Sequence, residues 1–200
     1  MPLRFDLRLD QYHTPPWLAE QIVARWWRVF ARRRVLEPSA GGGVLVDALF
    51  DRLPDARVTA IEMDRRWVRR LRRDQRERIE RGAVRVIAGD YLRLPPLPPH
   101  DIVFANPPFT DGLDTAHLRR MVDEVGEFVA VLRLAAWAGR ERRECVWSRG
   151  RMLHHAILEG RPRFSGMQGT PRHEFAVTHF ARSDLVRGRR AAEPEWWDVP

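Results

Sequence analysis

The chain has 200 residues, 44% of them apolar and 31% charged, which is typical of one globular domain with a sizeable core. No apolar run is long enough to span a bilayer, and residues 1–10 do not resemble a secretory signal. The net charge is +8, and all 35 basic residues are arginine. A nucleic-acid partner favours arginine and a positive charge, and a GC-rich genome also favours arginine because of its codons.

Cys145 is the only cysteine, so no intrachain disulfide can form. The histidines are scattered, and no group of cysteines and histidines has the spacing of a zinc site. We therefore expect a cytoplasmic protein, of a bacterium or of a phage-infected host cell, with no bound metal and no membrane partner.

The first predicted helix covers residues 17–32 and follows Tyr12-His13-Thr14-Pro15-Pro16. Thr14 is a suitable N-cap and prolines fit the first helical turn, so by themselves these residues indicate a helix start. Apolar residues recur at helical spacing, at Leu18, Ile22, Val23, Trp26, Val29 and Phe30.

Residues 35–43 predict a strand that runs into a glycine turn, followed by a short helix over 44–50. Glycine lets the backbone bend sharply and approach a ligand closely. The dinucleotide fingerprint Gly-x-Gly-x-x-Gly is not fulfilled, because counting from Gly41 and Gly43 the third position is Val46. The turn therefore indicates a cofactor loop and disfavours a nicotinamide dinucleotide.

Three further strands are predicted over 57–61, 83–88 and 101–105, and a helix over 65–81 ends at Gly82. The strands lead into Glu62, Asp90 and Asn106. The carboxyl ends of parallel strands meet at one edge of a sheet, where ligands bind. Glu62 lies about 20 residues beyond the glycine turn, the spacing of a carboxylate that accepts the hydroxyls of a ribose. The next residue, Met63, offers an apolar surface for an adenine ring.

Asn106-Pro107-Pro108-Phe109 follows the last of these strands. The two prolines stiffen the chain and offer no backbone donor, so the segment presents carbonyl oxygens and one amide side chain. Phe109 adds an aromatic face. This set suits a planar group that carries an NH2 and does not suit a phosphate.

The second half of the chain gives weaker signals. A helix is predicted over 116–125, a fifth strand over 127–134 and a basic helix over 140–159. Residues 162–166 and 174–180 are expected to form a closing antiparallel hairpin. The tail after residue 183 is charged, and Trp196 and Trp197 are expected to fold back onto the body.

Several of these segments resemble motifs of a known family. Thr14-Pro15-Pro16 resembles the motif that closes over the methionine end of the cofactor in adenine methyltransferases. Residues 106–109 fulfil (Asn/Asp/Ser)-Pro-Pro-(Tyr/Phe/Trp), the fourth motif of the amino-methyltransferases that use S-adenosylmethionine. Glu37, Gly41 and Gly43 resemble their first motif, Asp/Glu-x-x-x-Gly-x-Gly. The motif order over residues 10–110 resembles that of gamma-type adenine-N6 DNA methyltransferases. The second half is similar to small forms carried by phages and prophages.

The resemblance implies an α/β, Rossmann-like class I methyltransferase fold. This fold has a mostly parallel seven-stranded sheet with a closing antiparallel strand and helices on both faces. We expect a single domain over 1–200, with a cofactor half at 10–92, a catalytic and substrate half at 100–182 and a charged tail at 183–200.

The resemblance also implies S-adenosylmethionine as the cofactor and assigns the catalytic motif to Asn106, Pro107, Pro108 and Phe109. The Asn106 side-chain oxygen and the Pro107 carbonyl would accept the two N–H groups of the target amine. Phe109 would stack on a base flipped out of a duplex. The residues implied for cofactor binding are Tyr12, Thr14, Pro15, Glu37, Pro38, Ser39, Ala40, Gly41, Gly43, Glu62, Met63, Asp90, Tyr91 and Asn106.

The implied reaction is methyl transfer to N6 of adenine in DNA, with weak sequence specificity because no separate recognition domain is appended. DNA is thus the first expected partner and RNA the second. Three alternatives stay open: methylation of adenine or guanine in RNA, methylation of glutamine N5 in a protein, and a non-catalytic nucleic-acid-binding relic of the fold.

Overall fold

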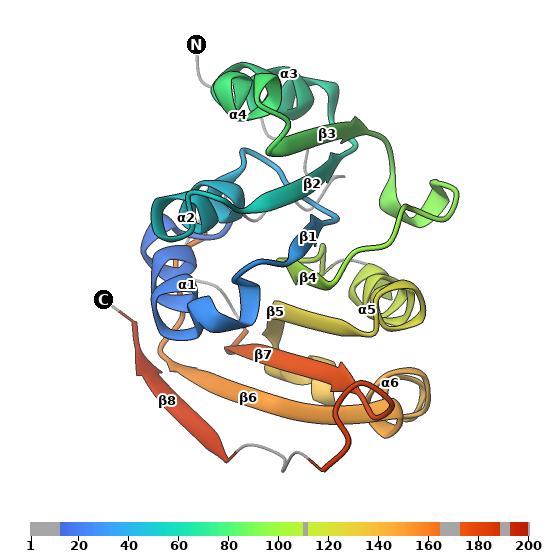
Figure 1. Ribbon diagram of the computed structural model, residues 1–200. Coiled ribbons are helices and arrows are strands. Elements are labelled where there is room, and N and C mark those ends of the chain that lie inside the picture. The colour runs from blue at the N-terminus through green and yellow to red at the C-terminus, as the bar shows by residue number, and fades with distance from the viewer. Residues whose placement is uncertain (1–12, 110–111, 165–172, 189–192, 200) are drawn as a thin grey trace.

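The computed structural model describes residues 13–109, 112–164, 173–188 and 193–199 (Figure 1). Strands and helices alternate through the first two thirds of the chain, as expected for a parallel sheet with helical crossovers. In chain order the elements are α1 (Pro16–Phe30), β1 (Arg34–Glu37), α2 (Val44–Arg52), β2 (Arg57–Glu62), α3 (Arg65–Asp74), α4 (Arg76–Glu80), β3 (Val84–Ala88), η2 (Tyr91–Arg93), β4 (Ile102–Ala105), α5 (Leu113–Glu124), β5 (Glu127–Arg133), η4 (Leu134–Trp137), α6 (Arg140–Cys145), η5 (Trp147–Arg149), β6 (Gly150–Glu159), β7 (Phe175–Arg182) and β8 (Pro194–Asp198).

Within the described residues the sheet has eight strands in the order β3-β2-β1-β4-β5-β7-β6-β8. Every neighbouring pair from β3 to β5 is parallel, and β7 is antiparallel to both of its neighbours. β8 runs parallel to β6 along the edge. The sheet is therefore mostly parallel with one reversed strand, as expected, but it contains one strand more than the seven predicted.

Helices cover both faces of the sheet, with α1 to α4 on one face and α5 and α6 on the other (Figure 1). The side chains of β4 alternate between the two cores. Ile102 and Phe104 belong to the core under α1 and α2, whereas Val103 and Ala105 belong to the core under α5. Because both faces are covered, this strand is a continuous apolar run in the sequence.

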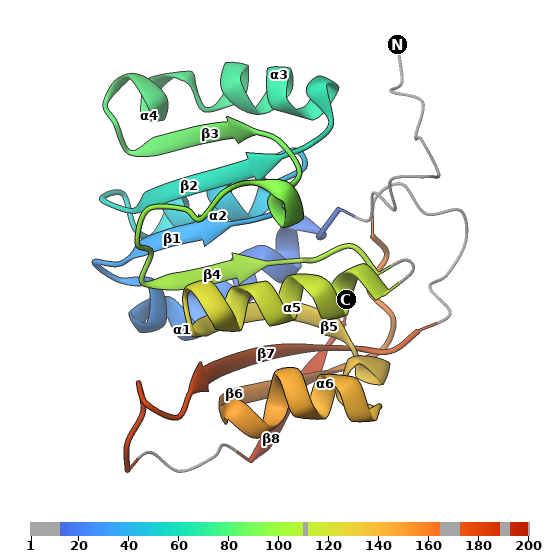
Figure 2. The ribbon, with the colours of Figure 1, turned by 90° about the vertical axis from the view of Figure 1, so that its right-hand side faces the viewer.

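The position of β1 determines where a ligand site forms. β1 lies between β2 and β4, so the crossovers leave it in opposite directions. In a doubly wound sheet this is the point where a crevice opens beyond the carboxyl ends of the strands. Figure 2 shows the arrowheads of β1 to β4 at the same edge, so the residues that follow these strands meet there.

The first helix buries its predicted apolar stripe but begins differently from the prediction. Its N-cap is Pro15, which makes no side-chain cap bond. Thr14, the expected cap, lies one residue too early and is buried with 4% exposure. The N-cap prediction for Thr14 is therefore wrong.

The helix predicted over 65–81 is divided into α3 and α4. The break falls at Gln75, which leaves the helical conformation (φ −97°, ψ 12°) and donates to Asp47 of α2 at 2.9 Å. A partly buried tertiary hydrogen bond thus competes with the helix at this point. Gly82, with φ +73°, follows α4 in the left-handed conformation that was predicted for the helix end.

Among the described residues, no helix combines the length and apolar composition that a membrane span requires.

The helix predicted over 140–159 is mostly wrong. Only Arg140–Cys145 is α-helical, and Gly150–Glu159 forms the long strand β6. A register shift between Met152 and His154 in the pairing with β7 changes which side chains face the core. This irregularity interrupts the alternation by which a strand is recognised in sequence.

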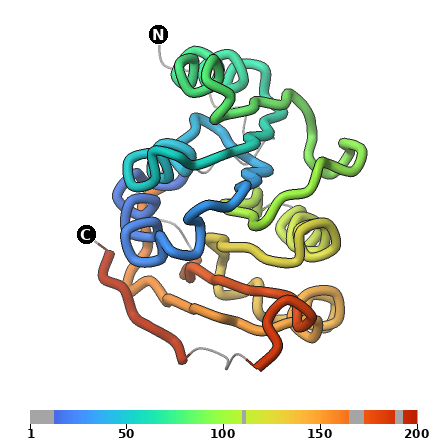
Figure 3. Tube along the Cα trace, viewed as in Figure 1, coloured from blue at the N-terminus to red at the C-terminus, as the bar shows by residue number. Residues whose placement is uncertain are grey.

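The closing hairpin was assigned to the wrong partner. β7 pairs with β6, whereas residues 162–164 lie outside the strands and 165–166 lie outside the described residues. The expected return of the tail onto the body is confirmed by Trp197, which is 1% exposed. Its ring centroid lies 5.1 Å from that of Trp26 in α1. Figure 3 shows α1, in blue, and the end of β8, in red, on the same side of the molecule. The neighbouring Trp196 is 63% exposed.

Candidate active site

Short contacts join the loops that follow β1, β2 and β4. The backbone N–H of Ala40 donates to the Ile61 carbonyl at 2.8 Å, and the Ser39 hydroxyl donates to the Asn106 carbonyl at 3.0 Å. The glycine turn is therefore attached to the carboxyl end of β2 on one side and to the Asn-Pro-Pro-Phe segment on the other. The sequence motifs meet in space as expected.

The glycine turn requires glycine on two counts at Gly41. Its φ is +51°, and a Cβ there would lie 2.7 Å from Nδ1 of His13. Its N–H donates to Oε2 of Glu62 at 2.7 Å. Gly43 has φ +88° and forms the left-handed N-cap of α2. The backbone can bend here because no side chain obstructs it.

Glu62 is held by two backbone donors, one at each oxygen. Besides Gly41, the N–H of Asp64 donates to Oε1 at 2.7 Å. Burial raises the pKa of the Glu62 carboxyl above its usual value, and these backbone bonds partly offset that effect. A carboxylate oxygen has more than one lone-pair site, so both oxygens can still accept hydroxyl groups. The observed orientation is compatible with ribose binding.

Glu37 lies deeper than Glu62, at 2% exposure. Its Oε2 has no hydrogen-bond partner in the part of the chain that the structure describes. Burial, together with the nearby carboxylates of Glu62 and Asp47, raises the pKa of Glu37 well above its usual value. A buried carboxyl oxygen without a partner is costly, and a cationic ligand group would relieve that cost.

A small cavity opens beside Glu37 and is lined by several of the residues selected from the sequence. The lining comes from the glycine turn, from the segment before α1 and from Asn106. The sequence analysis had assigned no role to His13, whose pKa is lowered by burial and by the charge of Arg70. The lining residues are His13, Thr14, Glu37, Ser39, Ala40, Gly42, Val44, Leu45 and Asn106.

Phe109 lies in the interior. Its ring is 6% exposed and packs against Phe175 at 5.5 Å and Phe164 at 6.5 Å, measured between ring centroids. In this conformation the ring is packed among other aromatic side chains, and stacking on a base stays a prediction. Its carbonyl accepts a hydrogen bond from Arg133 at 2.6 Å.

The residues predicted to bind adenine lie partly on the surface and partly in the core on the α5 side. Asp90 accepts from the N–H of Leu92 at 3.0 Å, and the adjacent Gly89 donates to the Glu62 carbonyl at 2.9 Å. Met63 is 55% exposed. The Tyr91 ring is buried in the core on the α5 side, where burial raises the pKa of its hydroxyl. Its predicted place beside the cofactor stays a prediction.

The remaining predicted positions frame the site. Pro15, Pro38 and Pro107 are buried, and Pro108 is half-buried. Tyr12 lies outside the described residues. The sequence analysis missed the arginine at the end of the fifth parallel strand, Arg133, which the position of a polar residue at a strand end could have indicated.

The strand order and the single reversed strand define the class I methyltransferase fold, and solved structures support this assignment. A candidate RNA methyltransferase from Pyrococcus horikoshii is 19% identical, with a TM-score of 0.75, and the match covers 90% of this chain and 91% of that one. A candidate class I methyltransferase from Listeria monocytogenes is 13% identical, with a TM-score of 0.74, over 97% of this chain and 68% of that one. At these identities the likeness establishes the fold.

The chain belongs to the methyltransferase small domain family, whose model matches residues 17–130. S-adenosylmethionine is the cofactor of this fold and family. The chain is also 41% identical over 78 residues to the candidate ribosomal RNA small subunit methyltransferase A of Methanospirillum hungatei. That match covers 39% of this chain and 29% of the relative's length.

The described residues fit this cofactor. S-adenosylmethionine carries a cationic sulfonium and an amino group, and the buried Oε2 of Glu37 is an acceptor with no partner among the described residues. The positive φ angles of Gly41 and Gly43 let the backbone approach a ligand. Glu62 presents a fixed carboxylate at the end of the neighbouring strand.

Proposed function

We propose that this chain transfers a methyl group from S-adenosylmethionine to N6 of adenine in nucleic acid. The observation that carries the proposal is the bond from the Ser39 hydroxyl to the Asn106 carbonyl at 3.0 Å, which joins the glycine turn to the Asn-Pro-Pro-Phe segment. An amine acceptor thereby lies next to the cofactor loop. Such proximity is what a direct methyl transfer requires.

The bound cofactor supplies an electrophilic methyl group, and the residues of this chain align the amine with it. The exocyclic nitrogen of adenine is a weak nucleophile because its lone pair is delocalised into the ring. In our proposal the Asn106 side-chain oxygen and the Pro107 carbonyl each accept one of its N–H groups, which favours a pyramidal nitrogen. Glu37 would neutralise a cationic group of the cofactor, and Glu62 would accept its ribose hydroxyls. Alignment then contributes more than a strong base.

RNA is the nucleic acid that we favour as substrate. The relative that is 41% identical over 78 residues is a candidate ribosomal RNA methyltransferase. DNA, which the motif order favours, is the second candidate, because Asn106 and Pro107 would bind the base and not the sugar. The net charge of +8 suits either polyanion.

The test is transfer of labelled methyl groups to ribosomal RNA, single-stranded DNA, duplex DNA and protein in parallel, followed by digestion and chromatography. We expect N6-methyladenosine from RNA. N6-methyldeoxyadenosine alone would select DNA, and methylguanine or methylglutamine would contradict the proposal. Absence of transfer to all four substrates would leave the non-catalytic alternative.

The same assay tests Asn106. Asn106→Ala should retain the fold and much of the cofactor affinity, while the rate falls by on the order of 10²–10³, the usual loss for one positioned hydrogen bond. Asn106→Asp keeps an acceptor oxygen and should retain part of the activity. An Asn106→Ala protein as fast as the parent would exclude this residue from the reaction.

A further inference from the structure

Arg133 connects the fifth parallel strand to the end of the Asn-Pro-Pro-Phe segment. It is the last residue of β5, next to β4 in the sheet, and so lies at the same edge as Asn106. Its Nη2 donates to the Phe109 carbonyl at 2.6 Å, and its guanidinium carbon lies 5.3 Å from the centre of the Phe109 ring. One cation therefore contacts both the backbone and the ring of the same residue.

Arg133 is itself oriented by a buried carboxylate. Asp114, in the first turn of α5, is 1% exposed and accepts from Nη2 of Arg133 at 3.1 Å. It also accepts from the N–H of Thr115 at 2.8 Å. Removing Asp114 would leave the guanidinium of Arg133 without this partner, so the carboxylate fixes the orientation of Arg133.

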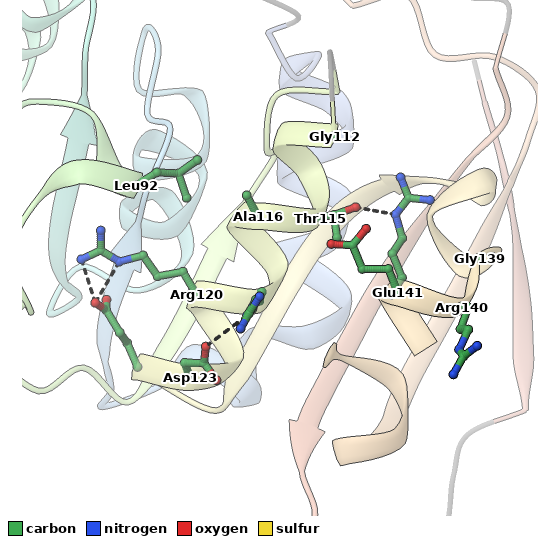
Figure 4. A pocket seen from close by; sticks show the side chains of 12 residues that line it. Leu92, Gly112, Thr115, Ala116, Arg120, Asp123, Gly139, Arg140 and Glu141 are labelled. Carbon is green, nitrogen blue, oxygen red and sulfur yellow. Dashed lines mark hydrogen bonds and ion pairs between the residues drawn. The ribbon is translucent and has the colours of Figure 1, made fainter. Parts of the chain in front are cut away.

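Arg142 completes the cluster from the other side. Its Nη2 lies 3.4 Å from both oxygens of Asp114, and its Nε donates to the Thr115 hydroxyl at 2.7 Å. The bond to Thr115 is the dashed line at that residue in Figure 4, which shows the open groove between α5 and α6. The first turn of α5 is thus attached to α6. Through Arg133 it is also attached to the end of the Asn-Pro-Pro-Phe segment, residues 106–109, which is the catalytic segment of the proposed function.

The catalytic segment is stiff between its two attachments. Ser39 binds the carbonyl of Asn106 and Arg133 binds the carbonyl of Phe109. Pro107 and Pro108 lie between them, and proline has a fixed φ and limits the residue before it. A displacement of the Phe109 carbonyl is therefore transmitted to the Asn106 side chain instead of being absorbed by the backbone.

We propose that Arg133, oriented by Asp114, is a positioning residue for the methyl transfer. It holds the end of the catalytic segment so that the Asn106 oxygen and the Pro107 carbonyl face the amine at the correct angle. This inference rests on the proposed function, because it assigns a role in the same reaction. The bonds of the cofactor loop to Glu62 and Ile61 do not involve Arg133, so they should persist when the Ser39 bond to Asn106 is perturbed.

The test compares Arg133→Met and Arg133→Lys with the parent protein. Arg133→Met should lower kcat about 10²-fold, the cost of misplacing a reacting group by roughly 1 Å. Cofactor affinity, measured by calorimetry, and KM for the nucleic acid should stay unchanged. Lysine retains the charge and can donate to either Asp114 or the Phe109 carbonyl. The kcat of Arg133→Lys should therefore lie between that of Arg133→Met and that of the parent. Arg140→Met is the matched control, because Arg140 is 83% exposed and pairs only with Glu144 among the described residues.

A second measurement needs no substrate and so separates this inference from the proposed function. Amide exchange followed by NMR should become faster at Phe109 and Thr115 in Arg133→Met and stay unchanged at Ile157 of β6. Asp114→Asn should reproduce this pattern if Arg133→Met does not fold. Unchanged exchange at Phe109, or a fall in cofactor affinity that accounts for the whole loss of rate, would overturn the positioning role even in a protein that methylates no nucleic acid.

Discussion

Glu37 and Glu62 show how position differentiates two residues of the same type. Both carboxyls end a strand of the sheet, and burial raises the pKa of each. Glu62 is held by two backbone N–H groups, whereas Oε2 of Glu37 has no partner within the described residues. Glu62 is thus already oriented, while Glu37 carries an unrelieved electrostatic cost. This difference makes Glu37 the residue whose protonation should respond most to the cofactor.

The first prediction concerns the pH dependence of cofactor binding. With its pKa raised well above the usual 4.5, Glu37 retains a proton in the free protein to higher pH than an ordinary glutamate. A cationic ligand favours the ionised form, so binding should release a proton and affinity should rise with pH until the raised pKa is passed. Calorimetry in buffers of different ionisation enthalpy measures this release. Glu37→Gln should bind more weakly and show no release, and an unchanged proton count would contradict the assignment.

Glu37→Gln should weaken cofactor binding but increase the stability of the free protein. A raised pKa in the folded state means that the proton stabilises the fold, fully below the unfolded value near 4.5 and progressively less as pH rises through the folded value. Glutamine stays neutral throughout. Glu37→Gln should therefore be more stable than the parent at neutral pH, and this difference should shrink as the pH falls towards the unfolded value. Denaturation at pH 5 and pH 8 checks this.

At the scale of elements, the glycine turn depends on backbone shape and not on side chains. Gly41 combines a φ of +51° with the close approach of His13, and its N–H holds Glu62. Gly82 also has a positive φ, +73°, but a Cβ there would meet nothing within 4 Å. The two positions therefore separate the cost of the left-handed backbone from the cost of filling the site.

The second prediction uses that pair. Gly82→Ala should lose about 1–2 kcal/mol of stability for the left-handed conformation and retain cofactor binding. Gly41→Ala should be destabilised by a similar amount and should also lose most cofactor affinity. The added methyl would displace His13 and break the hydrogen bond to Glu62. Chemical denaturation and calorimetry on both variants measure the two effects. Equal cofactor affinity in both variants would show that the turn does not approach the ligand.

The third prediction concerns β8, the strand that the sequence did not indicate. Trp197→Ala should lower the free energy of unfolding by about 3–5 kcal/mol, because its ring is 1% exposed and packs against Trp26. Trp196→Ala, at the 63% exposed neighbour, should change it by no more than about 0.5 kcal/mol. Urea denaturation of both variants is the measurement. Similar losses in the two variants would contradict the packing of this strand.

At the scale of the whole molecule, the charge balance determines how a nucleic acid would be bound. The chain carries 35 basic and 27 acidic residues, and many of the arginines pair with carboxylates, as Arg34 does with Asp101 at 2.8 Å. The net charge of +8 nevertheless favours contacts with phosphates. Phosphate contacts position a nucleic acid and carry no sequence information.

The fourth prediction follows from this balance. Nucleic-acid affinity should fall by roughly 10³-fold or more between about 50 and about 200 mM salt if six or more phosphates are contacted. Affinity should differ little among sequences of one polymer type. Fluorescence anisotropy with several labelled RNA and DNA sequences over this range is the measurement. A shallow salt dependence, or one sequence preferred by several orders of magnitude, would contradict phosphate-led binding.

The sequence alone determined the parallel strands that lead to the glycine turn, Glu62 and Asn106. Strands buried on both faces, such as β4, are continuous apolar runs, and the residues that end them follow directly in the chain. Once these strands are parallel, geometry brings Gly41, Glu62 and Asn106 to one edge. The strand-to-strand spacing of the motifs is local information, and so the meeting of these three residues could be predicted without coordinates.

Only the tertiary structure decided the second half and the support of the Asn-Pro-Pro-Phe segment. β6 was predicted as a helix because a register shift hides its alternation. β8 is a short edge strand that is stabilised by the packing of Trp197. Arg133 and Asp114 are separated by 19 positions in the sequence, and no local pattern indicates their pairing. Their role depends on which side chains a folded sheet edge and a helix terminus bring within bonding distance, and that information is absent from periodicity and spacing.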